Sequence, residues 1–243
     1  MLLVFVDETT DAKFRDYLGL SIATINARFY PLLKTRAQAI LQGIGWDPAV
    51  EFKGSHIFSA TSGCTDVVVE SRIDAAHALL DLNASGSNCR MKFYFGEMGA
   101  DDHRLAYLAG LPGLLFKAIP PAPGRAGKNL LSIACDTRSD ITAEEIDQAL
   151  SANIARRGYV LLEQTVQLRS SFSTVGIMFA DLVGYLAGRI DTISRDSELF
   201  EGLSPEQFER NGKIRKLQSS KKLVAKIKRL SLYTHTSAER SAA

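Results

Sequence analysis

Two apolar runs of this chain stop at an aspartate. Residues 2–6 are followed by Asp7, and residues 130–135 are followed by Asp136. Runs of this composition are typical of strands buried on both faces of a sheet, where an unpaired charge is costly. Either Asp7 opens a solvated turn, or it sits against a covered face together with other carboxylates.

Asp181 stands in the middle of a segment, residues 176–190, that is apolar nearly all round. A helix without a broad polar face is buried, and a buried carboxylate needs a cation, several hydrogen-bond donors or a proton. The structural alternative is an aspartate that accepts hydrogen bonds from Ser171, Ser173 or Thr174 near the start of the helix.

Glu51 lies in the short segment 50–55, which is expected to be a strand or an extended loop. On a strand, Lys53 would point to the same face as Glu51. Its ammonium could pair with the acids when metal is absent, contact a substrate phosphate, or form a simple cross-sheet ion pair. Glu8 would face away from Asp7 on a regular strand, so we expect it to act only through its neighbours.

Carboxylate oxygens are the ligands that Mg²⁺ and Mn²⁺ prefer. Two such ions about 4 Å apart can activate a water and stabilise the leaving oxygen of a phosphodiester. The four histidines stand far apart and the three cysteines form no CxxC pair, so the sequence indicates no zinc site. We expect one catalytic metal site built from four acids: Asp7, Glu51, Asp136 and Asp181.

The expected elements alternate along the chain in the manner of an α/β fold. Strands are expected near residues 2–6, 17–25, 50–55, 91–95, 130–135 and 159–168. Helices are expected near residues 31–43, 66–82, 101–118, 143–157 and 176–190. Thr142 and Glu145 form a capping box, and the acids at 101–102 suit a helix N-terminus. This order predicts a mixed sheet flanked by helices on both faces.

Composition describes an ordinary globular chain: 243 residues, 46% hydrophobic and 23% charged, with a net charge of +2. No apolar run approaches the roughly 18 residues that a membrane span needs, and no signal peptide is expected. The odd number of cysteines suggests a reducing compartment, with Cys135 as a small core residue. We therefore predict a cytoplasmic protein that does not enter a membrane; its oligomeric state does not follow from the sequence.

Basic residues gather near the end of the chain. Between residues 211 and 237 there are eight lysines and arginines and no acid: Lys213, Arg215, Lys216, Lys221, Lys222, Lys226, Lys228 and Arg229. An amphipathic helix here could dock its apolar stripe on the body and present its cations to nucleic-acid phosphates. A solvated face or contact with a membrane surface are the alternatives. We expect a body of residues 1–192 and a basic helical extension of residues 193–243.

Several segments carry a resemblance to a known family. The matching pieces are residues 4–8, residues 51–55, Asp136 and residues 176–183. Through them the chain resembles the domain-of-unknown-function 3800 family, whose members have, or are predicted to have, a ribonuclease H-like fold. The resemblance spans about residues 1–190. Thr9-Thr10 replaces the usual Ser-Gly, and Met178 replaces a usual Gln, but neither change removes a carboxylate.

The resemblance implies a ribonuclease H-like fold in which Asp7 bridges two metals and Glu51, Asp136 and Asp181 complete the sites. It implies a divalent-metal-dependent nuclease acting on RNA or DNA. The alternative is an inactive module of the same fold that binds nucleic acid or a protein. A phosphatase of the haloacid dehalogenase type is disfavoured, because it needs a second aspartate where this chain has Thr9.

Overall fold

The computed structural model describes most of the chain. The described residues are 1–11, 14–59, 66–83, 91–99, 102–124, 128–168, 174–188, 221–223, 225–226 and 229. Among the helices of these residues, none combines the length and the apolar character required to cross a membrane.

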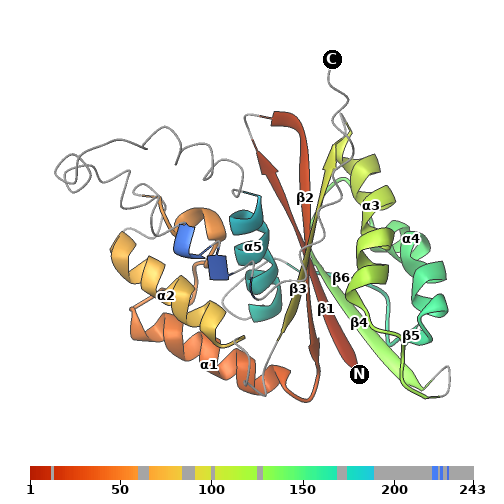
Figure 1. The fold of residues 1–243 in the computed structure, drawn as a ribbon, viewed down its shortest axis with the longest axis horizontal. Helices are drawn as coiled ribbons and strands as arrows, with labels where there is room; N and C mark the ends of the chain where they lie inside the picture. Colours follow the sequence, from red (N-terminus) through yellow and green to blue (C-terminus); the bar gives the residue numbers. More distant parts are fainter. Residues whose placement is uncertain are drawn as a thin grey trace.

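A six-stranded sheet forms the centre of the fold, in the order β3-β2-β1-β4-β5, with β6 also paired to β4 (Figure 1). The first hairpin, as expected, pairs β1 (Leu2–Asp11) with β2 (Phe14–Asn26), and β3 (Lys92–Gly99) joins β2. These three strands are antiparallel. The other three strands run parallel to β1: β4 (Asn129–Asp136), β5 (Tyr159–Leu161) and β6 (Val166–Leu168). The predicted mixed sheet is confirmed.

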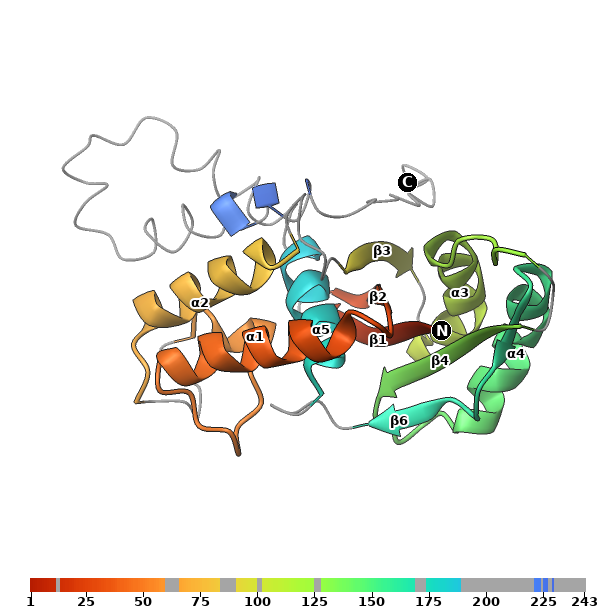
Figure 2. The same ribbon diagram turned by 90° about the horizontal axis from the view of Figure 1, so that it is seen from below.

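Helices cover both faces of this sheet, as the sequence predicted (Figures 1 and 2). One face carries α1 (Tyr30–Gly43), α2 (Val69–Asp81) and α5 (Val175–Ala187), together with the short 3-10 helix η1 (Gly54–His56). The other face carries α3 (His103–Ala118) and α4 (Ala143–Arg156). Each layer has its own hydrophobic core, so the sheet separates two cores.

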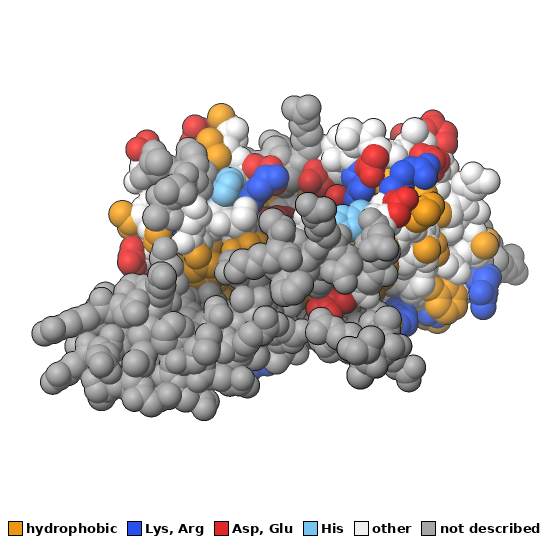
Figure 3. All heavy atoms as spheres, turned by 90° about the horizontal axis from the view of Figure 1, so that it is seen from above, with side chains coloured by type: hydrophobic (Ala, Val, Ile, Leu, Met, Phe, Trp, Pro, Cys, Tyr) orange, Lys and Arg blue, Asp and Glu red, His pale blue; other side chains and the backbone are white. Residues whose placement is uncertain are grey.

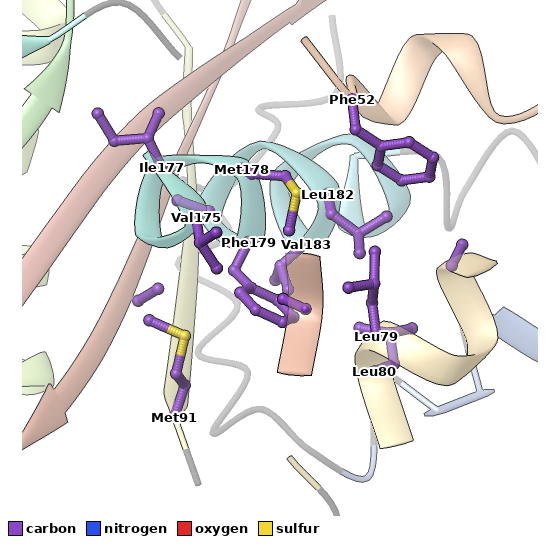
Figure 4. Packing of buried hydrophobic residues seen from close by; sticks show 14 of the residues in the cluster. Phe52, Leu79, Leu80, Met91, Val175, Ile177, Met178, Phe179, Leu182 and Val183 are labelled. Carbon is purple, nitrogen blue, oxygen red and sulfur yellow. The ribbon is translucent and has the colours of Figure 1, made fainter. Parts of the chain in front are cut away.

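Helix α5 is the most buried helix of the fold, because it lies between the sheet and the outer helices. All its residues except Asp181 and Tyr185 are buried. Phe179 and Val183 point into the core shared with α2, where Leu79 and Leu80 lie (Figure 4). This burial confirms the expectation drawn from the apolar sequence around Asp181.

Two predicted helix starts are confirmed. Thr142 and Glu145 form the expected capping box of α4, with each side chain bonded to the other's backbone N–H. Asp102 caps α3 and accepts a hydrogen bond from the backbone N–H of Leu105 at 3.0 Å. Such caps satisfy backbone donors that the first turn of a helix leaves unpaired.

One predicted strand differs from the structure. The single strand expected at 159–168 is divided into β5 and β6, because the chain between them leaves the sheet toward α4. There the backbone N–H of Thr165 bonds to Asp147 at 3.1 Å, and the Thr165 hydroxyl bonds to the same carboxylate. Of the two alternatives for the segment 50–55, a strand or an extended loop, the structure has the loop, which leads into η1.

The described part of the basic extension packs on the body. Leu223 is fully buried in the core formed by α1, α2 and α5. The Nζ of Lys226 lies 2.7 Å from the Asp81 carboxylate at the end of α2. Lys221, Lys222 and Arg229 are exposed. The other predicted contact residues, Lys213, Arg215, Lys216 and Lys228, lie outside the described residues, as does the predicted boundary at 192–193.

Candidate functional site

Two of the predicted acids lie side by side on neighbouring strands. Strands β1 and β4 are parallel, and the last pair of their register joins Val6 to Cys135. Asp136 then ends β4, and Asp7 stands beside it within β1, which continues to Asp11. In the view from above in Figure 3, acidic, basic and histidine side chains lie near one another in the upper half of the visible face. The parallel pairing of β1 and β4 brings the first two acids together.

Asp7 faces the α5 side of the sheet and is only 6% exposed. Burial raises the pKa of the Asp7 carboxyl well above its ordinary value, and the negative charges of Asp181 and Asp136 raise it further. Asp7 therefore does not open a solvated turn: β1 continues to Asp11, and the carboxylate lies against the covered face.

Asp181 reaches the same place from α5. Its Oδ2 accepts a hydrogen bond from the backbone N–H of Gly54 at 2.5 Å. Burial raises the pKa of Asp181 to about 6; the Gly54 bond opposes this shift, whereas the charges of Glu51 and Asp136 add to it. Of the alternative partners suggested by the sequence, Ser171 and Ser173 lie outside the described residues.

Small residues spaced by four let α5 approach the sheet closely enough to bring Asp181 near Asp7. A Cβ on Gly176 would lie 2.4 Å from the Phe5 ring, and one on Gly184 would lie 2.8 Å from the Thr9 hydroxyl. Between them, the backbone carbonyl of Ala180 accepts a hydrogen bond from Ser21 Oγ at 2.8 Å. The repeat of small residues every four positions was the signal in the sequence that could have predicted this close contact.

The loop before η1 supplies Glu51 and Lys53. Lys53 Nζ lies 3.2 Å from Glu51 Oε2, and their side chains are 42% and 20% exposed. Arg72, buried on α2, donates a hydrogen bond to the backbone carbonyl of His56 at 2.5 Å and so fixes the end of η1. Arg72 has no signal in the sequence, because a lone arginine on a helix resembles any exposed cation.

Glu8 faces the α3 side of the sheet, opposite to Asp7, as expected for the next residue of a strand. It forms an ion pair with Arg138, which also binds Asp140 and lies over the ring of Tyr107. Burial raises the pKa of Glu8, while Arg138 opposes the shift. Arg138, which has no signal in the sequence, links β1 to the segment after β4.

The four predicted acids therefore converge on one edge of the sheet. Asp7 and Asp181 act on each other's charge, Asp136 acts on both, and Glu51 acts on Asp181. The donors are all carboxylate oxygens, which fits Mg²⁺ or Mn²⁺ in type. However, among the residues that the structure describes, no three His, Cys, Asp or Glu side chains are already arranged as a ligand cage.

Three of the acids each have a different polar neighbour. The backbone N–H of Gly54 binds Asp181, the N–H of Thr137 binds Asp136 at 2.9 Å, and Lys53 pairs with Glu51. The residues fit a divalent cation by the chemistry of their oxygens.

Comparison with known proteins identifies no close relative. No protein-family model matches the chain, and no curated protein matches it. Among solved structures, ribonuclease H2 from Pyrococcus horikoshii OT3 is similar, at 11% sequence identity and a TM-score of 0.40, over 94% of this chain and 99% of that one. The α/β class follows from the observed sheet and helices, and the candidate chemistry follows from the residues of this chain.

Proposed function

We propose that this protein is a ribonuclease H-like member of the domain-of-unknown-function 3800 family that acts as a divalent-metal-dependent nuclease. It would hydrolyse phosphodiester bonds of RNA or DNA in the cytoplasm. One observation carries the proposal. Asp7, which is buried on β1, and Asp181, which is half-buried on α5, bring like charges together beside two further acids.

This arrangement is unfavourable for a protein that binds no cation. Bringing like charges together in a buried place costs stability, and a structural role would be served equally well by uncharged side chains. Asp7, Glu51, Asp136 and Asp181 would hold Mg²⁺ or Mn²⁺. When bound, a pair of such ions supplies water activation and neutralises charge at the leaving oxygen.

The chain's own residues prepare the site for an anionic substrate. Close packing of α5 on β1 fixes the backbone that carries Asp7 and Asp181, so little rearrangement is needed on binding. Lys53, partly exposed beside the acids, would contact a phosphate of the substrate. Burial of the two aspartates keeps water away from one side of the site and strengthens the electrostatic interactions within it.

A cleavage assay tests the proposal. Purified protein is incubated with labelled RNA, DNA and RNA–DNA hybrid in Mn²⁺, in Mg²⁺ and in EDTA, with Asp181→Asn as the inactive control. We expect cleavage of at least one substrate by the wild type in metal and none in EDTA. Mn²⁺ binding without cleavage of any substrate would instead favour the inactive module that binds nucleic acid or a protein.

The basic extension gives a second test of the nucleic-acid partner. Deleting it would also remove Leu223 from the core, so neutralisation is the cleaner change. Replacing the exposed Lys221, Lys222 and Arg229 with glutamine should weaken nucleic-acid binding and lower the salt slope by about 0.7–0.9 for each phosphate that these cations neutralise in the wild type. Lys117→Gln, an exposed cation on α3, is the control. An unchanged slope of log Kd against log salt would show that these three cations do not contact the nucleic acid.

A further inference from the structure

Lys53 is the cation of the loop that faces the acids. Its Nζ pairs with Glu51 at 3.2 Å. The negative charges of Asp181 and Asp136 also act on this ammonium. In the metal-free protein, the lysine therefore partly neutralises three of the four acids.

The backbone of this loop is fixed, whereas the Lys53 side chain has room to move. The next residue, Gly54, donates its N–H to Asp181, and a Cβ on Gly54 would lie 2.5 Å from Tyr185. The Lys53 side chain itself is 42% exposed. The ammonium can therefore change partners by rotation of its side chain, without displacement of the loop.

Occupancy of the site by divalent cations reverses the electrostatic balance at Lys53. Two such ions carry as much positive charge as the four carboxylates carry negative charge, so the attraction that holds the ammonium disappears. The Lys53 ammonium, a third cation beside the two metal ions, is then favoured there only if a further anion is present. The anion that a nucleic-acid substrate brings to this edge of the sheet is a phosphate.

We propose that Lys53 exchanges partners: it pairs with the carboxylates in the metal-free site and contacts a nucleic-acid phosphate once metal is bound. This inference rests on the proposed nuclease function. It predicts opposite effects of one substitution. Removing the ammonium removes a competitor of the metal and also removes a group that binds the substrate, so metal binding should tighten while nucleic-acid binding weakens.

Lys53→Met tests this by two binding measurements that need no turnover. Calorimetry should show Mn²⁺ affinity raised about two- to fivefold over wild type, the range of a partly exposed ion pair. Fluorescence anisotropy with a phosphorothioate oligonucleotide, which keeps its charge and resists cleavage, should show affinity in Mn²⁺ lowered by a similar factor. In EDTA, the oligonucleotide affinity should equal that of wild type, because Glu51 holds the lysine.

Controls separate this inference from the proposed function. Lys117→Met removes one positive charge from α3 and should change neither the Mn²⁺ affinity nor the oligonucleotide affinity. Lys53→Arg keeps the positive charge, so both affinities should be close to those of wild type. Mn²⁺ binding by wild type but not by Asp181→Asn would support the metal site. If Lys53→Met then leaves the Mn²⁺ affinity unchanged, or weakens oligonucleotide binding as much in EDTA as in Mn²⁺, partner exchange is wrong although the metal site is supported. If wild type binds no Mn²⁺, both proposals fail together.

Discussion

Asp181→Asn is expected to raise the melting temperature of the metal-free protein while abolishing Mn²⁺ binding. The carboxylate is half-buried among other acids, and its pKa of about 6 exceeds the ordinary value of 3.8. A shift of this size corresponds to destabilisation on the order of 3 kcal/mol at neutral pH. For a chain of this length, removing it raises the melting temperature by at most about 6–12 °C. The asparagine oxygen can still accept the Gly54 hydrogen bond.

The stabilisation should depend on pH in a defined direction. A carboxyl whose pKa is raised by folding contributes stability that is fully present below its unfolded value and is lost as pH rises through the folded value. The difference in melting temperature between Asp181→Asn and wild type should therefore be small near pH 4 and should grow through pH 6. Calorimetric melting in EDTA across this range measures it.

Asp74→Asn makes the same chemical change at an exposed position of α2. We expect it to leave both the melting temperature and Mn²⁺ binding close to wild type. Equal Mn²⁺ affinity in wild type and Asp181→Asn would show that α5 contributes no ligand. A lower melting temperature of Asp181→Asn at pH 7 would show that the carboxylate stabilises the fold.

Gly176→Ala is expected to destabilise the protein through contact between α5 and β1. The new methyl group would lie 2.4 Å from the Phe5 ring, which is itself stacked on Tyr30 with ring centroids 5.1 Å apart and cannot easily move. Overpacking of this kind costs about 1–3 kcal/mol, which outweighs the gain in helix propensity. Melting should fall by several degrees, and Mn²⁺ affinity should weaken because α5 carries Asp181.

Gly113→Ala is the matched control, because Gly113 lies within α3 and a Cβ there would meet nothing within 4 Å. Without a steric cost, alanine should stabilise the helix by about 0.5–1 kcal/mol. The two glycine substitutions should thus change the melting temperature in opposite directions. A rise in both would mean that α5 can move away from β1 without loss of packing.

Periodicity was sufficient to predict the α/β class, most elements and the burial of the helix that carries Asp181. It placed Asp7 and Asp136 each after an apolar strand, but the parallel pairing of these two strands became visible only in the structure. It could not predict that Thr165 would bind α4 and divide a strand, because that contact joins residues distant in sequence.

The same limit applies to the surroundings of the acids. Arg138 binds Glu8 from the segment after β4, and Arg72 holds η1 from α2. Each is a single cation without a local pattern. What the sequence reveals at this site is therefore the acids themselves, whereas the residues that hold the surrounding segments in place become visible only in three dimensions.

The burial of Leu223 determines which of the two helical layers is completed first during synthesis. The layer of α3 and α4 uses residues up to 168, so it can close over the sheet during synthesis. The other layer needs α5 and then Leu223, more than thirty residues later in the chain. Because domains form as their residues leave the ribosome, the layer that carries Asp181 is completed only after Leu223 has been synthesised. A ribosome that stops before Leu223 would release a chain whose candidate metal site lacks its full support.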